Sequence, residues 1–149
     1  MPYLRITCAE FSAERRRVIA VRLTDAINDL FYNPRGRLTR GQVRERTTIH
    51  FTTYAEAELF IGGQTPAERG TKDVTPELSD WSMSVHHQRR IAKNLTPLLA
   101  ELFEVAPDDL DGINIRFHSY PPTDFAIGGR LISDLVPRVG HLMKRLRDR

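Results

Sequence analysis

The sequence is poor in cysteine: Cys8 is the only one among 149 residues. A single thiol excludes a disulfide within the chain and favours a reducing compartment, so we expect a cytoplasmic protein. No basic stretch followed by an apolar core marks a signal peptide, and no apolar run approaches the roughly 18 residues of a membrane-spanning helix. We therefore expect a globular domain with no membrane partner, in keeping with 40% hydrophobic and 28% charged residues.

Metal-binding and nucleic-acid-binding signatures are also missing. No cysteines and histidines have zinc-ligand spacing, and the adjacent His86 and His87 do not share a helix face. Basic residues gather in the segment 35–46 and at the C-terminus, but no interleaved aromatic residues or binding motif accompany them. We expect no metal site and no nucleic-acid partner. The basic segments are interpreted as solvated faces, or alternatively as attracting a small anionic substrate.

The dipeptide Met1–Pro2 opens a stretch with β-strand character. Because proline is small, we expect removal of Met1 to expose the Pro2 nitrogen as a secondary amine. An α-amino group titrates near roughly pH 7.7, and apolar surroundings disfavour its cation. Such a nitrogen could act first as a general base and then as a general acid. The alternative is that proline merely begins a strand, where it is tolerated.

The first part of the sequence predicts a strand, a helix and a second strand. The strand covers 2–8, and the helix begins after an N-cap at Ser12 and ends near 31–33, because Pro34 cannot continue it. The arginine-rich segment 35–46 is expected to be a connector, and 47–51 has β propensity. A short apolar run then ends in the pair Gly62–Gly63.

The same order follows a polar linker at 64–72. We expect a strand over 73–79, a helix capped by Ser82 or Ser84, and a strand over 113–117. Three prolines affect the predicted position or regularity of these elements and of a final helix. Pro76 indicates an edge or bulged strand, Pro97 predicts a kink or a later helix start, and Pro137 falls in the first turn of a final helix that begins near Asp134.

The two halves match each other at constant offsets. The apolar positions of the first helix fall on those of the second 72 residues later, and the first Gly-Gly run falls on the second 66 residues later. The matched positions are Ile19, Leu23, Ala26 and Leu30 with Ile91, Leu95, Leu98 and Leu102, and Ile61-Gly62-Gly63 with Ile127-Gly128-Gly129. We therefore predict one α+β domain over 1–149, with β-α-β units at 2–63 and 73–133 and a C-terminal helix at 134–149.

Each β-α-β crossover makes its two strands parallel and places the helix on one face of the sheet. Two such units predict a four-stranded sheet with two helices on one face. The other face remains to be covered, and self-association would cover it.

The strand opened by Met1–Pro2, the duplicated unit and the run Phe60-Ile61-Gly62-Gly63 resemble the tautomerase superfamily, which has the 4-oxalocrotonate tautomerase or MIF-like fold. The fused, cis-3-chloroacrylic acid dehalogenase-like branch is the most similar. The resemblance covers residues 2 to about 133. It implies a homotrimer, Pro2 as general base or acid, no cofactor, and a small anionic substrate such as an enolisable 2-oxo acid or a related unsaturated carboxylic acid.

The chain departs from the dehalogenase pattern at its catalytic positions. Ile27 occupies the position at which that pattern has a histidine late in the first helix. Asp80 and Met83 occupy the positions of two arginines ahead of the second helix. Arg116 replaces a strand tyrosine and Ile127 the water-activating glutamate. These replacements argue against hydrolytic dehalogenation, because no second group is left to activate water.

Proton transfer between carbon and oxygen needs only a base and a group that holds the anionic substrate. Arg116 is the candidate cation, and alternation along its strand places Asn114 and His118 on the same face. His50 holds the equivalent position in the first half, and Asp80 is a further substrate-binding candidate, with Trp81 and Tyr120 as weaker ones. An arginine paired at a subunit interface is the alternative for Arg116.

We therefore expect a cofactor-independent tautomerase or isomerase that uses Pro2 for keto-enol proton transfer. Two other functions fit the same residues. One is a non-catalytic oligomeric binding protein that keeps the fold, and the other is a decarboxylase of the same superfamily.

Overall fold

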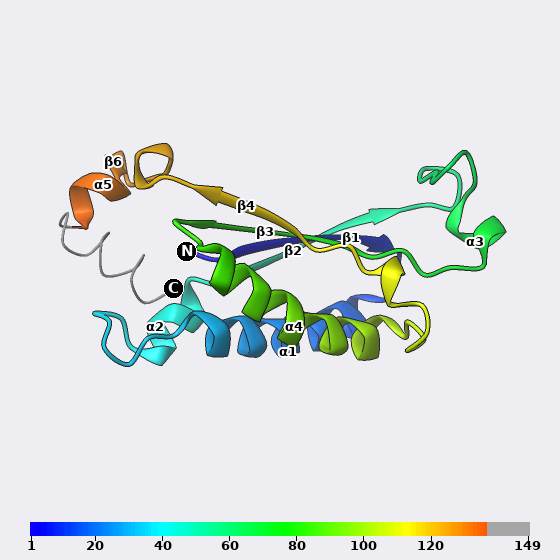
Figure 1. Cartoon of the computed structure of the whole chain (residues 1–149), viewed down its shortest axis with the longest axis horizontal. Helices are drawn as coiled ribbons and strands as arrows, with labels where there is room; N and C mark the ends of the chain where they lie inside the picture. Colours follow the sequence, from blue (N-terminus) through cyan, green and yellow to red (C-terminus); the bar gives the residue numbers. More distant parts are fainter. Residues whose placement is uncertain (137–149) are drawn as a thin grey trace.

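The computed structural model describes residues 1–136. Its centre is a four-stranded sheet in the order β2-β1-β3-β4 (Figure 1). The β1–β2 and β3–β4 pairs are parallel and the central β1–β3 pair is antiparallel, as two β-α-β crossovers require. The strands are β1 (Tyr3–Ala9), β2 (Thr48–Tyr54), β3 (Thr75–Trp81) and β4 (Arg116–Tyr120).

Two long helices, α1 (Ala13–Phe31) and α4 (Val85–Phe103), cover one face of this sheet (Figure 1). Each begins where a serine side chain accepts a backbone N–H: Ser12 from Arg15 and Ser84 from His87. The predicted α+β class, sheet and one-sided helix layer are confirmed. Among residues 1–136 no helix is long and apolar enough to cross a membrane.

The core lies between the sheet and the helices. Alternate residues of β1 and β3, including Leu4, Ile6 and Leu78, are fully buried on the helix side. They pack against helix residues spaced four apart, which share one helix face. The buried helix residues are Ile19, Leu23 and Ile27 from α1 and Ile91, Leu95 and Leu99 from α4.

Two expected loops contain helices. The segment 35–46 includes α2 (Arg40–Glu45), and the linker 64–72 includes α3 (Pro66–Arg69). Both begin with a capping box, Thr39 with Gln42 and Thr65 with Glu68, in which side chain and backbone exchange hydrogen bonds. This Thr-x-x-Gln/Glu spacing is visible in the sequence, so the connector and linker predictions were incomplete for a detectable reason.

The basic segment is docked on α1 by ion pairs. The guanidinium groups of Arg40 and Arg44 pair with Asp29 and Asp25, and Arg40 also lies 4.9 Å from the centroid of the Tyr32 ring. These contacts are exposed, so each is worth little by itself. They show that part of the arginine cluster serves to hold α2 against α1.

The two Gly-Gly runs form matching turns. Gly62 and Gly63 have φ values of 61° and 81°, and Gly128 and Gly129 have 56° and 78°. Two consecutive positive φ values define the tight turn that suits a hairpin, and glycine adopts them without a Cβ clash. The second turn joins β5 (Ala126–Ile127) to β6 (Arg130–Leu131), whereas the first is closed by an isolated bridge.

The expectation that Pro76 marks an edge or bulged strand was wrong about the edge. Its strand, β3, lies between β1 and β4, and Pro76 is paired with Ile6. On the β4 side, the continuous pairing begins only at Glu77, after an isolated bridge between Val74 and Ile113. Proline has no N–H to donate, and the sheet accommodates it at this gap.

Two helix predictions differ in part from the structure. Of the two alternatives at Pro97, a kink or a later helix start, the later start is wrong, because α4 runs through Pro97 from Val85 to Phe103. The C-terminal helix expected from Asp134 is instead a single turn, α5 (Ile132–Leu135), and Val136 is extended. The remainder of that prediction, with Pro137, lies outside the described residues. Two 3₁₀ turns, η1 (Leu110–Gly112) and η2 (Pro122–Asp124), flank β4.

Replacing Leu99 by alanine tests the core. Leu99 is 0% exposed on α4, so Leu99→Ala should lower the free energy of unfolding by about 2–5 kcal/mol through lost burial and a cavity. Leu38→Ala, at a 36% exposed residue, is the matched control and should change it by less than about 0.5 kcal/mol. Denaturant unfolding at one protein concentration measures both, and equal losses would contradict this core.

Candidate functional site

The N-terminus lies at the end of the sheet where α4 begins (Figure 1). Pro2 is buried and shares the helix-facing side of β1 with Leu4, and its carbonyl oxygen accepts a hydrogen bond from the Thr48 N–H. The Met1 ammonium nitrogen is 2.6 Å from Asp80 Oδ1. The chain start is therefore held by β2 on one side and by a β3 carboxylate on the other.

Strand register brings Asp80 to this place. Tyr3 is paired with Ser79 in the antiparallel β1–β3 ladder, so the next position sets Pro2 level with Asp80. Both side chains fall on the helix side, and Asp80 is 2% exposed. The predicted substrate-binding residue Asp80 lies against the cationic chain terminus. As a carboxylate it would repel, and not attract, the anionic end of a substrate.

Tyr120, at the end of β4, belongs to the same end of the sheet. It is paired with Trp81, and burial, reinforced by the negative charge of Asp80, raises the pKa of its phenol to about 12. At neutral pH the phenol is therefore a hydrogen-bond donor. Tyr120 also lies 5.8 Å, centroid to centroid, from the ring of Phe125.

A hollow of about 330 Å³ adjoins Tyr120 and the start of α4. The connection from β3 to α4 shapes it, because Ser82 has a φ of 53° and the Met83 N–H donates to Ser119 Oγ at 2.9 Å. Sequence reasoning missed this hollow, since no motif marks it. Its lining residues are Ser82, Met83, Ser84, Ser119, Tyr120 and Pro121.

The other candidates lie on the sheet face away from the helices. His50, Asn114 and Arg116 are exposed, whereas Ile115 and Phe117 pack towards the core, which agrees with the predicted alternation. His50 Nδ1 is 2.5 Å from the Tyr3 hydroxyl. Within residues 1–136 the Arg116 guanidinium has no hydrogen bond or ion pair.

This open face also carries an ion-pair network. Arg5 Nη2 lies 2.7 Å from Glu77 Oε2, and His118 Nε2 lies 3.4 Å from Glu77 Oε1. The hydrogen bond from Arg5 is the main cause that lowers the pKa of the Glu77 carboxyl. A sheet face with charges already paired is suited to burial against another surface.

Within one chain, Arg116 and Pro2 are not brought together. Ser119 is the β4 residue paired with Asp80, and Arg116 precedes it by three positions, roughly 10 Å along the strand. The two side chains also fall on opposite faces. A single chain therefore unites Pro2 and Asp80, with Tyr120 at the same end of the sheet and close enough to Asp80 for its charge to raise the pKa of the phenol, and it leaves His50, Asn114 and Arg116 apart from Pro2.

Three residues expected at replaced dehalogenase positions have ordinary structural surroundings. Ile27 is fully buried in the core, and Met83 is also buried, beside the hollow. Ile127 is a partly exposed hairpin residue. None of these three side chains can move a proton.

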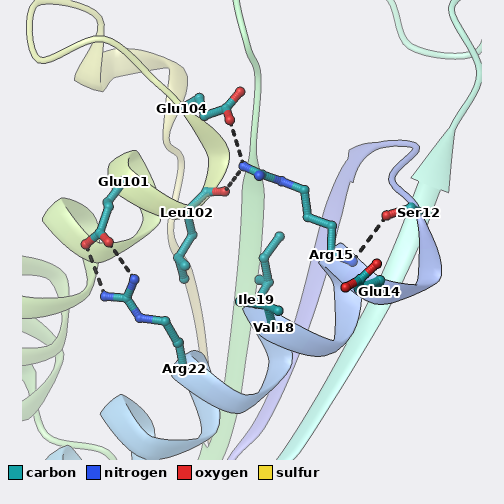
Figure 2. A pocket seen from close by; sticks show the side chains of 9 residues that line it. All are labelled: Ser12, Glu14, Arg15, Val18, Ile19, Arg22, Glu101, Leu102 and Glu104. Carbon is teal, nitrogen blue, oxygen red and sulfur yellow. Dashed lines mark hydrogen bonds and ion pairs between the residues drawn. The ribbon is translucent and has the colours of Figure 1, made fainter.

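A larger hollow of about 450 Å³ lies at the other end of the sheet, between the start of α1 and the end of α4 (Figure 2). Its charges compensate each other across the two helices. Arg22 donates to both carboxylate oxygens of Glu101 at 2.5 and 3.1 Å, and Arg15 lies 3.0 Å from Glu104. We interpret it as a clamp between helices and not as a substrate site.

No group of three or more histidine, cysteine, aspartate or glutamate residues within 1–136 could hold a metal ion. The candidate site offers an amine, a carboxylate and a neutral phenol.

Solved structures share this fold. An asymmetric trimer of the F6 fused 4-OT is 17% identical with a TM-score of 0.68, covering 91% of this chain and 99% of that one. N1, a member of the cis-3-chloroacrylic acid dehalogenase family, is 17% identical with a TM-score of 0.65 and covers 99% of each chain. The chain has the tautomerase-superfamily fold. No protein-family model and no curated protein matches the sequence.

A third structure with the tautomerase fold is that of Pt0534 inactivated by 2-oxo-3-pentynoate. It is 15% identical to this chain with a TM-score of 0.71, covering 91% of this chain and 99% of that one. Identities this low establish the shared fold and leave the activity to be argued from the residues of this chain.

Cys8 is not a nucleophile of this site. Burial raises the pKa of its thiol to about 11, opposed by the nearby charge of Arg16, so the thiol is protonated at neutral pH. We expect native protein to react with a disulfide reagent roughly 100-fold or more slowly than unfolded protein at pH 7.5. Absorbance of the released thiolate measures this, Cys8→Ser gives the background, and equal rates would contradict the burial.

Proposed function

We propose that the protein is a cofactor-independent tautomerase that transfers a proton between carbon and oxygen of a small 2-oxo or unsaturated carboxylic acid. Pro2, exposed as the N-terminal amine after removal of Met1, would remove the proton from the carbon next to the carbonyl and return it. The placement of the partly buried chain terminus against a buried carboxylate is the observation that carries this proposal. A strand that simply began with proline would not need a terminus 2.6 Å from a buried carboxylate.

The neighbouring groups fit this chemistry. A neutral phenol at Tyr120 can donate a hydrogen bond to the oxygen that becomes negative during enolisation, which is the stabilisation such a transition state requires. The hollow of about 330 Å³ beside Tyr120 and the start of α4, which Pro2 and Asp80 do not line, is of a size for a small molecule. Serines and backbone at its edge offer further donors to a carboxylate.

Arg116 would take part only through assembly. Its face of the sheet is uncovered in one chain, and the similar F6 fused 4-OT is a trimer. In a homotrimer of this chain, we propose that Arg116, with His50 and Asn114, lies beside the Pro2 of another subunit and holds the anionic end of the substrate. This extends the proposal to a shared site.

The amine mechanism is tested with 2-oxo-3-pentynoate, an electrophilic ynone that amines attack and that inactivates the similar Pt0534. Intact mass should first show loss of Met1. Processed protein should ketonise enolised phenylpyruvate, and the reagent should abolish turnover as it adds one equivalent to the N-terminal peptide. Pro2→Ala keeps a primary amine and should lower kcat/KM about 10-fold or more.

The matched control is a chain with one extra residue before Pro2, whose nitrogen is then an amide. It should be inactive and unlabelled at this position. Turnover that survives labelling would remove Pro2 from the mechanism. Processed protein without turnover would favour the non-catalytic binding protein, and release of carbon dioxide from a 3-oxo acid would favour the decarboxylase.

Arg116→Ala tests the shared site. Loss of a cation that holds the substrate carboxylate should raise KM about 10-fold with kcat less affected, and Arg116→Lys should recover part of it. Steady-state kinetics with light scattering for molecular mass provide the measurement, and Arg35→Ala is the control for lost charge. Dissociation of the assembly by Arg116→Ala would instead identify an interface arginine.

A further inference from the structure

The carboxylate of Asp80 is the feature that the proposed tautomerase reaction leaves unexplained. It is 2% exposed and 2.6 Å from the Met1 ammonium nitrogen. Burying an ionised carboxylate is costly unless cations or hydrogen-bond donors accompany it. A general base needs no carboxylate beside it, because a negative charge favours the cationic form of a nearby amine.

Removal of Met1 moves the terminal amine by one residue along the chain, to Pro2, which is level with Asp80. Extension of the β1–β3 register by one position sets Pro2 opposite Asp80, on the same side of the sheet. Directly opposed residues of an antiparallel pair have Cα atoms about 4.5–5.5 Å apart. The new amine therefore lies within reach of the carboxylate that the old one contacted.

We propose that Asp80 is the counter-ion of the Pro2 amine and holds it as an ammonium group, so that the resting protein is prepared to give a proton and not to take one. The inference rests on the proposed function and sets its direction: in the resting protein Pro2 acts first as the acid in ketonisation, and it removes a proton from carbon only in the reverse, enolising reaction. Asp80 acts through Pro2 and is a positioning residue. The preferred substrate is then the enol form of a 2-oxo acid, as released by a preceding elimination or hydrolysis.

The proton balance follows from this resting state. The Pro2 ammonium donates its proton to the enol carbon, and a C–H bond forms from the C=C electron pair. The enol oxygen loses its proton to water and becomes the carbonyl oxygen. The neutral amine then takes a proton from water, which restores the ammonium group without any redox partner.

The other titratable groups at this end of the sheet do not replace Asp80. Tyr120 is a neutral phenol at physiological pH. His87 of α4 is buried, and its Nε2 donates to the Leu30 carbonyl oxygen of α1 at 3.1 Å. His50 of β2 lies on the opposite face, bonded to Tyr3.

A direct titration of the amine tests the inference. Processed protein labelled with ¹⁵N-proline is titrated by NMR and compared with a synthetic peptide of residues 2–9. The Pro2 resonance should titrate about one pH unit or more above the peptide. In Asp80→Asn the midpoint should fall towards the peptide value. Glu77→Gln, on the same strand but the opposite face, should leave it unchanged.

Kinetics supply the second readout. Because the ammonium form is the proton donor, kcat/KM for ketonisation should stay level through neutral pH and fall only above the titration midpoint. Asp80→Asn should move this fall to lower pH. A wild-type midpoint at or below that of the peptide would overturn the inference, and this result does not depend on whether Asp80→Asn folds.

The two proposals fail separately. A raised midpoint that depends on Asp80, in a protein without turnover, would support the counter-ion and refute the tautomerase. Turnover that depends on Pro2, with a midpoint at the peptide value, would support the tautomerase and refute the counter-ion.

Discussion

The antiparallel pairing of β1 with β3 is the constraint on which the rest of the structure depends. It joins two β-α-β units, each internally parallel, into one sheet. It also fixes the register, and a slip by one residue would exchange the two faces of a strand. Leu4, Ile6 and Leu78 are buried, and Pro2 lies level with Asp80, because of this one register.

The register divides polar chemistry between the two faces of the sheet. On the helix side, the partly buried terminus meets the buried Asp80 at the end of an apolar core, where electrostatic interactions are stronger than in water. On the open side, Arg5, Glu77 and His118 form a network that a second surface could cover. The proposed chemistry belongs to the first face, and the proposed shared site depends on the second.

Local sequence signals predicted the main elements because their causes are local. Ser12 and Ser84 cap the two long helices, Pro34 follows the end of α1, and paired glycines form both tight turns. The short helices α2 and α3 were not predicted, although each begins with a capping box whose spacing is visible in the sequence. Pro76 was misplaced at an edge because a strand's neighbours, and the gap that accommodates a proline, are decided by pairing across the sheet.

By itself, the sequence determined the α+β class, the tandem units, the one-sided helix layer and Pro2 as the candidate amine, since these follow from periodicity, capping and a duplicated pattern. Only the tertiary structure decided which polar residues meet. Asp80 joins the N-terminus and Arg116 is separated from it, although both were proposed to hold substrate. The physical reason is that strand order and register, which are long-range properties, determine the distance between residues 2, 80 and 116.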